Sequence, residues 1–237
     1  MNPNTRPSLA GLLPEVVALA EAAGVDIMAI YNAGPTAVMH KVDDSPLTAA
    51  DLAAHGRIVV GLQQLTPDIP VVSEEGCVPD EGARAAPVFW LVDPLDGTKE
   101  FVARNGEFTV NIALIEQGRP VLGVVTVPAQ KVSYWGLMGE GAYRRHTGEM
   151  QAQRLQVAVP REAGRPVRVM ASKHHFHEDT RTLIARMGAH ELVQAGSSLK
   201  FCRIAEGAAD VYPRLGPTCE WDTAAAQAVV EAAGGHV

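Results

Sequence analysis

The sequence predicts an α/β fold, an α+β sandwich in which helices pack on β-sheets. Two observations favour it. In the second half of the chain, apolar strands and amphipathic helices alternate, an order typical of layered α/β proteins. In the first half, two helices with apolar residues three and four positions apart precede a series of apolar strands separated by turn residues.

The first half is predicted to contain two helices followed by strands. Residues 12–31 place apolar side chains on one helical face, and residues 49–65 form a second such pattern, closed by Thr66-Pro67. A short strand over 68–76 runs into Glu74 and Glu75, and VFWLV (88–92) is a buried strand. From 108 to 143 the chain is predicted to form a meander, with strands over 108–115, 121–127, 131–137 and 141–145.

The second half is predicted to alternate between the two element types. Strands are expected over 167–172, 190–197 and 210–215, and helices over 178–188, 198–208 and 221–235. A polar stretch with two prolines lies between residues 145 and 165. We therefore expect an N-terminal α+β subdomain over 1–150 and a C-terminal α/β subdomain over 151–237.

Composition excludes several classes of protein. The chain has 237 residues with a formal net charge of −7 and no run of Lys and Arg, which argues against binding nucleic acid or an anionic membrane surface. Its three cysteines form no CxxC pair, so zinc and disulfide chemistry are not indicated. No stretch of 18 apolar residues predicts a membrane span. We expect a soluble cytoplasmic protein, either free or peripheral at the inner membrane.

Carboxylates follow two of the predicted strands. Asp93 and Asp96 flank Pro94 directly after VFWLV, Glu74 ends the preceding strand, and Asp222 opens the last helix. If these side chains converge, each pair at 4 Å repels by roughly 4 kcal/mol at an effective dielectric constant near 20. Divalent cations such as Mg²⁺ prefer oxygen ligands and would relieve that repulsion. Carboxylates shared by two such ions are the arrangement used for phosphoryl transfer to water.

Each of these residues also has a simpler explanation. DPLDG is typical of a turn, in which Pro94 and Gly97 shape the backbone. Asp222 at a helix start is typical of an N-cap, and Thr48 with Asp51 has the spacing of a capping box. Glu74 and Glu75 after a strand are typical of a solvated loop. The case for a site therefore depends on the motifs occurring together.

Together, seven motifs in order along the chain resemble the inositol monophosphatase superfamily of Mg²⁺-dependent, lithium-sensitive phosphatases. The motifs are DSPLTAAD (44–51), VVSEEG (71–76), WLVDPLDGTKEF (90–101), GEFTVNIALI (106–115), GSSLKFC (196–202), YPRLGPT (212–218) and WDTAAA (221–226). The branch they resemble most acts on 3′(2′),5′-bisphosphate nucleotides. The resemblance implies alternating α/β/α/β/α layers, and further residues beyond the final GGHV.

The resemblance implies a role for each matching residue of the metal site. Glu74, Asp93 and the backbone carbonyl of Leu95 would hold one Mg²⁺, and Asp93, Asp96 and Asp222 a second. A third, weaker ion would share Glu74, and Li⁺ would inhibit. Asp51 and Thr98 would orient and deprotonate the attacking water, with Glu74 also counted among the catalytic residues. Gly97 and Thr98 would offer backbone amides to the phosphate, close to a helix start.

On the nucleotide side, the resemblance implies that His174, Ser197, Lys200 and Arg214 approach the second phosphate. The substrate-contacting set is thus Glu74, Leu95, Asp96, Gly97, Thr98, His174, Ser197, Lys200, Arg214 and Asp222. A second phosphate needs partners of its own, which gives these polar and basic side chains a physical purpose. The sequence DGTK, which contains Lys99, resembles the nucleotide branch more than the inositol monophosphatases. The sequence does not indicate which groups Lys99 contacts.

The activity implied is hydrolysis of the small-molecule substrate adenosine 3′,5′-bisphosphate to AMP and phosphate, in support of sulfate assimilation. Within the superfamily, the alternatives are an inositol monophosphatase and a fructose-1,6-bisphosphatase, which share the metal site. From a different class, the chain would be a non-catalytic module that senses a nucleotide or a metal. The intact set of metal and water-activating positions favours the enzyme. The oligomeric state is not indicated.

Overall fold

A seven-stranded sheet forms the centre of the structure, a computed structural model that describes residues 8–237 except 42–45, 77–81, 83–84, 159–163 and 173–177. Its strands lie in sequence order. β3 and β4 are parallel, and every other neighbouring pair is antiparallel, as the meander prediction required. The strands are β3 (Val71–Ser73), β4 (Val88–Asp96), β5 (Thr109–Glu116), β6 (Arg119–Val127), β7 (Val132–Leu137), β8 (Gly141–His146) and β9 (Gln153–Leu155).

Two long helices cover one face of this sheet, α1 (Leu9–Asn32) and α2 (Ala49–Leu65). Successive side chains of a strand point to opposite faces, and both faces of β4 are buried. Trp90 and Val92 pack with α1 and α2, whereas Leu91 belongs to a second core on the other face. The continuous apolar run VFWLV is explained by this burial on both sides.

Helices α6 (Leu199–Ala205) and α7 (Glu220–Ala232) pack on the second face. Glycines in the sheet let α7 approach closely. A Cβ atom on Gly123 would lie 2.1 Å from the carbonyl oxygen of Ala225, and one on Gly136 would lie 2.5 Å from that of Ala228. The lack of a side chain at these two positions therefore allows the short distance between α7 and the sheet. This distance also fixes how far Asp222 lies from the strands.

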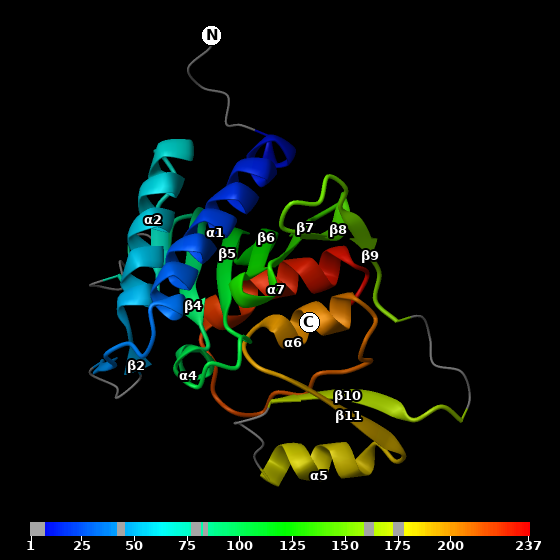
Figure 1. The fold of residues 1–237 in the computed structure, drawn as a ribbon. Helices are drawn as coiled ribbons and strands as arrows, with labels where there is room; N and C mark the ends of the chain where they lie inside the picture. The colour runs from blue at the N-terminus through cyan, green and yellow to red at the C-terminus, as the bar shows by residue number, and fades with distance from the viewer. Residues whose placement is uncertain (1–7, 42–45, 77–81, 83–84, 159–163, 173–177) are drawn as a thin grey trace.

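A smaller parallel sheet lies beyond α6 and α7. It pairs β10 (Val167–Ser172) with β11 (His190–Ala195) in register, and α5 (Glu178–Arg186) lies on its outer side. The layers therefore run α1/α2, seven-stranded sheet, α6/α7, two-stranded sheet and α5, as Figure 1 shows. This arrangement confirms the predicted α/β sandwich of five alternating layers.

The predicted strand over 210–215 is wrong. Among these residues only Val211 forms a bridge, to Val169, and the chain then leaves the sheet. Pro213 explains this, because proline has no N–H to donate to a ladder. Conversely, β9 extends the main sheet within a stretch that was predicted to be irregular. The short elements β1 (Met39–His40), β2 (Pro46–Leu47), α4 (Thr98–Val102) and the 3₁₀ turn Pro128–Gln130 were not predicted.

The subdomain boundary near residue 150 stays a prediction. β9 still belongs to the seven-stranded sheet, and α7 from the C-terminal half packs against its central strands. Within the described residues, no helix has the length and apolar character needed to cross a membrane.

Candidate active site

Three carboxylates from two distant segments meet at one edge of the main sheet. Asp93 and Asp96 lie at the end of β4, and Asp222 lies in the first turn of α7. One oxygen from each lies within 4.8 Å of the other two. The ladder between β4 and β5 shifts register between Asp93 and Asp96, where Pro94 cannot donate a hydrogen bond. The strand thus continues through the motif with a bulge, and the predicted turn begins only at Gly97.

The carboxylates repel one another strongly. Asp93 is buried, and burial raises its pKa well above the usual range, with further contributions from Glu74, Asp96 and Asp222. Burial and the charge of Asp222 raise the pKa of Asp96 to about 6, although Lys200, Ser197 and the Ser198 amide oppose the rise. A cluster of this kind is stabilised by a cation, and its all-oxygen donor set suits Mg²⁺ rather than a thiophilic metal.

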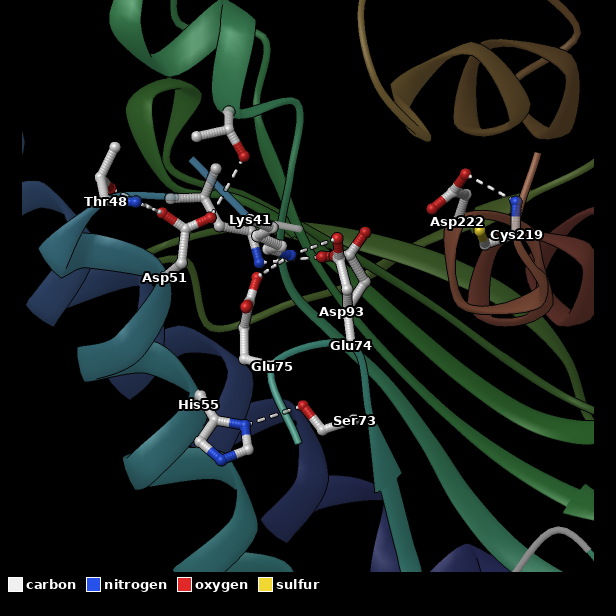
Figure 2. A network of polar contacts seen from close by, with 12 residues as sticks. Lys41, Thr48, Asp51, His55, Ser73, Glu74, Glu75, Asp93, Cys219 and Asp222 are labelled. Carbon is white, nitrogen blue, oxygen red and sulfur yellow. Dashed lines mark hydrogen bonds and ion pairs between the residues drawn. The ribbon is translucent and has the colours of Figure 1, made fainter. Parts of the chain in front are cut away.

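Asp222 has a structural role as well as a place in the cluster. Its Oδ2 accepts hydrogen bonds from Cys219 N (3.0 Å) and from Thr218 Oγ1 (2.8 Å), and Figure 2 shows the Cys219 contact. The simple expectation that Asp222 is an N-cap needs correction, because the cap is Cys219 and Asp222 is the third residue of α7. The two contacts hold the carboxylate at the helix start.

Glu74 reaches the same region from β3. Its backbone N–H donates to Val92 O at 3.0 Å, which continues the parallel pairing and places Glu74 beside Asp93 (Figure 2). Lys41 Nζ lies 2.8 Å from Glu74 Oε1 and 2.6 Å from Glu75 Oε1. Burial alone would lower the pKa of Lys41, but its hydrogen bonds to the two glutamates raise it above the ordinary value. The sequence interpretation did not include Lys41, and no periodic pattern marks it.

Asp51 and Thr98 lie together, as the resemblance implied. Thr98 Oγ1 donates to Asp51 Oδ1 at 3.1 Å. Asp51 also completes the capping box of α2, since its Oδ2 accepts from Thr48 N at 2.8 Å and Thr48 Oγ1 at 2.6 Å. Burial raises the pKa of Asp51, and the Thr48 and Thr98 hydrogen bonds lower it in part. The cap and the contact with Thr98 therefore coexist in one residue.

The residues after Asp96 form the turn into α4. Gly97 has φ 91°, in the left-handed region, and precedes Thr98 at the helix start. A Cβ at Gly97 would lie 3.2 Å from Glu100 Oε2 and 3.3 Å from Ser197 Cβ, so any other residue would crowd these two side chains in addition to straining the backbone. Leu95 is buried, and its N–H donates to Asp93 Oδ1 at 3.1 Å. This contact orients the Asp93 carboxylate.

A cavity of about 210 Å³ opens above the carboxylates. Its basic residues are Lys99, Arg214 and Lys200, of which Lys200 is buried. Lys200 Nζ donates to Ser197 O at 2.5 Å and lies 5.8 Å from the ring centre of Tyr212. Arg214 Nη2 donates to Pro217 O at 2.7 Å, whereas its Nε is buried without a partner among the described residues. The cavity is thus lined by both acidic and basic residues.

The remaining predicted residues differ in how they relate to the cavity. Ser197 lines it, but its hydroxyl donates to Asp96, and Lys99 lines it as an exposed side chain. His174 lies outside the described residues. Cavity residues to which the sequence analysis gave no role include Glu100, Ser172 and Tyr212. Glu100 and Tyr212 lie within the motifs quoted for the family resemblance, and that position was the available signal.

Comparison with known proteins identifies the family of this chain. The model of the inositol monophosphatase family matches residues 10–237. The chain belongs to this family. It is therefore an enzyme, and the family's activity makes it a phosphatase. That membership confirms the resemblance drawn from the seven motifs.

Two relatives and two solved structures illustrate the similarity. The chain is 52% identical over 227 residues to the 3′(2′),5′-bisphosphate nucleotidase CysQ of Salmonella typhimurium, covering 95% of this chain and 89% of that one. With the protein of the same name from Escherichia coli K12 the identity is 49% over the same shares. The crystal structure of CysQ from Bacteroides thetaiotaomicron has a TM-score of 0.81 at 42% identity, covering 94% and 86% of the two chains. Mycobacterium tuberculosis SuhB has a TM-score of 0.75 at 26% identity, covering 95% and 85%.

Proposed function

We propose that this chain is a Mg²⁺-dependent 3′(2′),5′-bisphosphate nucleotidase that converts adenosine 3′,5′-bisphosphate to AMP and phosphate. The observation that carries the proposal is one cavity lined by Asp96 and Asp222, which converge with Asp93, and also by Lys200 and Arg214. A substrate with two phosphates needs both the acidic cluster and the basic residues. About half of the residues are identical to those of proteins named for that activity.

The residues present fit divalent cations. Glu74, Asp93, Asp96 and Asp222 would hold two ions, with the Leu95 carbonyl completing one set and a third ion sharing Glu74. Burial and mutual repulsion raise the pKa values of Asp93 and Asp96, and bound cations would offset both effects. Mg²⁺ supplies Lewis-acid stabilisation of the phosphate and lowers the pKa of water. Li⁺ inhibition is part of the same proposal.

The chain's own residues would handle the proton. Thr98 Oγ1 orients the attacking water and donates its own proton to Asp51 Oδ1 as it accepts one from the water. Asp51 is suited to hold the proton because burial raises its pKa. The backbone N–H groups of Gly97 and Thr98 would stabilise negative charge on the phosphate oxygens. No covalent intermediate with the protein is required.

Lys200 and Arg214 would bind the other phosphate of the substrate. Arg214 has a buried Nε without a protein partner among the described residues, and a phosphate oxygen is an acceptor that would satisfy it. His174, in the segment between β10 and α5, is proposed to join them. A cytoplasmic location and a role in sulfate assimilation complete the proposal.

The deciding experiment compares phosphate release from adenosine 3′,5′-bisphosphate with release from inositol 1-phosphate and fructose 1,6-bisphosphate. Each is measured with Mg²⁺, with Mg²⁺ plus Li⁺, and with EDTA. We expect kcat/KM to favour the bisphosphate nucleotide and to vanish in EDTA. A preference for inositol 1-phosphate would favour the sugar-phosphatase alternative. Absence of release from every substrate would favour a sensing module.

A further inference from the structure

A chain of buried hydroxyl groups lies directly behind Asp96. Ser197 Oγ contacts Asp96 Oδ2 at 2.6 Å, and Thr109 Oγ1 lies 2.6 Å from Ser197 Oγ. Thr109 Oγ1 also lies 2.8 Å from Ser198 Oγ, which lies 2.7 Å from Asn111 Oδ1. Thr109, Ser198 and Asn111 are at most 1% exposed. These contacts link Asp96 to the middle of β5 without water.

This chain of hydrogen bonds lacks one proton. Four contacts connect Asp96 Oδ2 to Asn111 Oδ1, but the three hydroxyls supply three protons, and an ionised carboxylate and an amide oxygen only accept. At the same end, Asn111 Nδ2 is buried and has no partner in the described part of the chain. A half-turn of the Asn111 amide supplies the missing proton, because Nδ2 then donates to Ser198 Oγ. The Oδ1 atom then takes the buried position in which Nδ2 had no partner.

With the amide turned, each of the four contacts between Asn111 and Asp96 Oδ2 has one donor and one acceptor. The Ser197 hydroxyl also lies 2.9 Å from the backbone oxygen of Asp96, and its one proton is directed at the closer Oδ2. Asn111 donates to Ser198, Ser198 to Thr109, Thr109 to Ser197, and Ser197 to Asp96 Oδ2. The opposite direction would need a proton on Asp96, and a protonated acid is a poor ligand for a cation. Aligned hydrogen bonds polarise one another, so the chain favours the carboxylate form of Asp96.

We propose that Asn111, Ser198, Thr109 and Ser197 form a one-directional hydrogen-bond chain that positions Asp96 as a carboxylate for the cation, and that Ser197 is a positioning residue rather than a substrate ligand. The proposal rests on the proposed function, in which Asp96 binds Mg²⁺. It reassigns Ser197, which the family resemblance had placed on the nucleotide side. It also gives Thr109 and Asn111 a role that neither the motifs nor the relatives' names contain.

The backbone at Ser197 supports this role. Ser197 has φ 52°, a left-handed conformation that non-glycine residues seldom adopt. In this conformation the Ser197 hydroxyl and the Ser198 N–H both reach Asp96 Oδ2, each at 2.6 Å. The strained residue therefore directs two donors at one carboxylate oxygen, and strain of this kind is typical of functional sites.

Thr109 provides the sharpest test, because its buried side chain does not line the cavity. Its backbone pairs with Asp96 across β4 and β5, and a valine keeps that pairing while removing the hydroxyl. We would measure Mn²⁺ binding by electron paramagnetic resonance, without substrate, for Thr109→Val and Thr109→Ser. Loss of a residue that orients a metal ligand typically costs at least tenfold in affinity. We expect the dissociation constant to rise about tenfold in Thr109→Val and to return towards wild type in Thr109→Ser.

The matched control is Thr126→Val. Thr126 Oγ1 lies 3.0 Å from Ser133 Oγ, both are buried in the same sheet, and neither contacts Asp96. Thr126→Val should lower Tm to a similar degree but leave the Mn²⁺ dissociation constant unchanged. Equal weakening of Mn²⁺ binding in both variants, or none in Thr109→Val, would overturn the proposal.

A second measurement separates this inference from the proposed function. A neutron crystal structure would show the deuterium positions on the three hydroxyls and on Asn111. We expect Asn111 Nδ2 to donate to Ser198 and every hydroxyl to point towards Asp96. The reverse order would overturn the proton chain even if the enzyme hydrolyses bisphosphate nucleotides. The expected order would support it even if another substrate is preferred.

Discussion

Thr98 donates a hydrogen bond from Oγ1 to Oδ1 of Asp51 across 3.1 Å, joining the first turn of α4 to the first turn of α2. The two residues are 47 positions apart in the sequence. Because Oδ2 of Asp51 is occupied by Thr48, Oδ1 is the oxygen that faces the catalytic side. In the proposed mechanism, this contact provides a path for a proton between the cavity and a buried carboxylate.

Removing the Thr98 hydroxyl is expected to slow catalysis without weakening substrate binding. Thr98→Ala should lower kcat about a hundredfold, the lower range for a lost general-base contribution, while KM changes little. Thr98→Ser keeps the hydroxyl and should retain most of the activity. Steady-state kinetics with the nucleotide substrate test this, and wild-type kcat in Thr98→Ala would remove Thr98 from the proton path.

Asp93→Asn is expected to change activity and stability in opposite directions. Burial and three neighbouring carboxylates raise the pKa of Asp93, so a neutral side chain relieves repulsion in the metal-free protein. Tm in EDTA should rise by about 2–4 °C, the effect of 1 kcal/mol in a protein of this size. Phosphate release at saturating Mg²⁺ should fall at least about a hundredfold, because an amide is a poorer ligand. Near wild-type activity would contradict the two-metal assignment.

The sequence predicted the parts of this site that are close together along the chain. Asp93 and Asp96 follow a strand whose burial on both faces was evident from VFWLV. The five-layer sandwich and the pairing of Asp51 with Thr98 came from the family resemblance, since no local pattern relates residues from two different helices. β9 was missed because its sequence, Gln153–Leu155, is polar and mostly exposed, and an edge strand carries little periodic signal.

The role of Ser197 illustrates what the sequence does not contain. Whether its hydroxyl faces a substrate or Asp96 depends on the left-handed backbone at this one residue, which propensity does not predict for serine. Thr109 and Asn111 did leave a signal. They are polar residues two positions apart in the otherwise apolar strand FTVNIALI, which places both on one face. A buried polar pair of this kind indicates a network.

The metal-free protein is expected to gain stability from this site as pH falls from 7 to 5. The pKa of Asp96 is raised from 3.8 to about 6, so in this window the folded protein binds a proton that the unfolded chain has lost. Lower pH therefore favours folding through Asp96, and rising pH removes that contribution. Melting curves in EDTA for wild type and Asp96→Asn test this, and the wild-type Tm should rise relative to the variant as pH falls.

The comparison with Asp96→Asn is necessary because other groups titrate. Burial lowers the pKa of His55, which destabilises the fold as pH falls through the ordinary histidine range. Arg168 and Arg165 hold the pKa of Asp210 low despite its burial, so its stabilisation is lost only below about pH 4. Both contributions are shared by the two proteins and cancel in the difference. Parallel Tm curves would contradict the raised pKa of Asp96.

Arg214→Ala is expected to affect a bisphosphate more than a monophosphate. If Arg214 binds the second phosphate, KM for adenosine 3′,5′-bisphosphate should rise about tenfold or more, the effect of losing a charged hydrogen bond. KM for adenosine 3′-monophosphate should change little. Because Arg214 also donates to Pro217 O, the ratio of the two effects is diagnostic, and Arg119→Ala is a control at an exposed arginine. Equal effects on both substrates would indicate a structural role.

Gly97→Ala is expected to impair the site beyond the cost of backbone strain. An alanine in the left-handed region costs about 1–2 kcal/mol, and here its Cβ would also press on Glu100 and Ser197 at 3.2–3.3 Å. Gly139 has a similar φ of 85° but open space around its Cα, so Gly139→Ala measures the strain alone. Both variants should lower Tm, whereas only Gly97→Ala should lower kcat/KM and weaken Mn²⁺ binding, because Ser197 would move away from Asp96. If Gly97→Ala loses stability alone, the packing of Gly97 against Ser197 does not matter to the metal site.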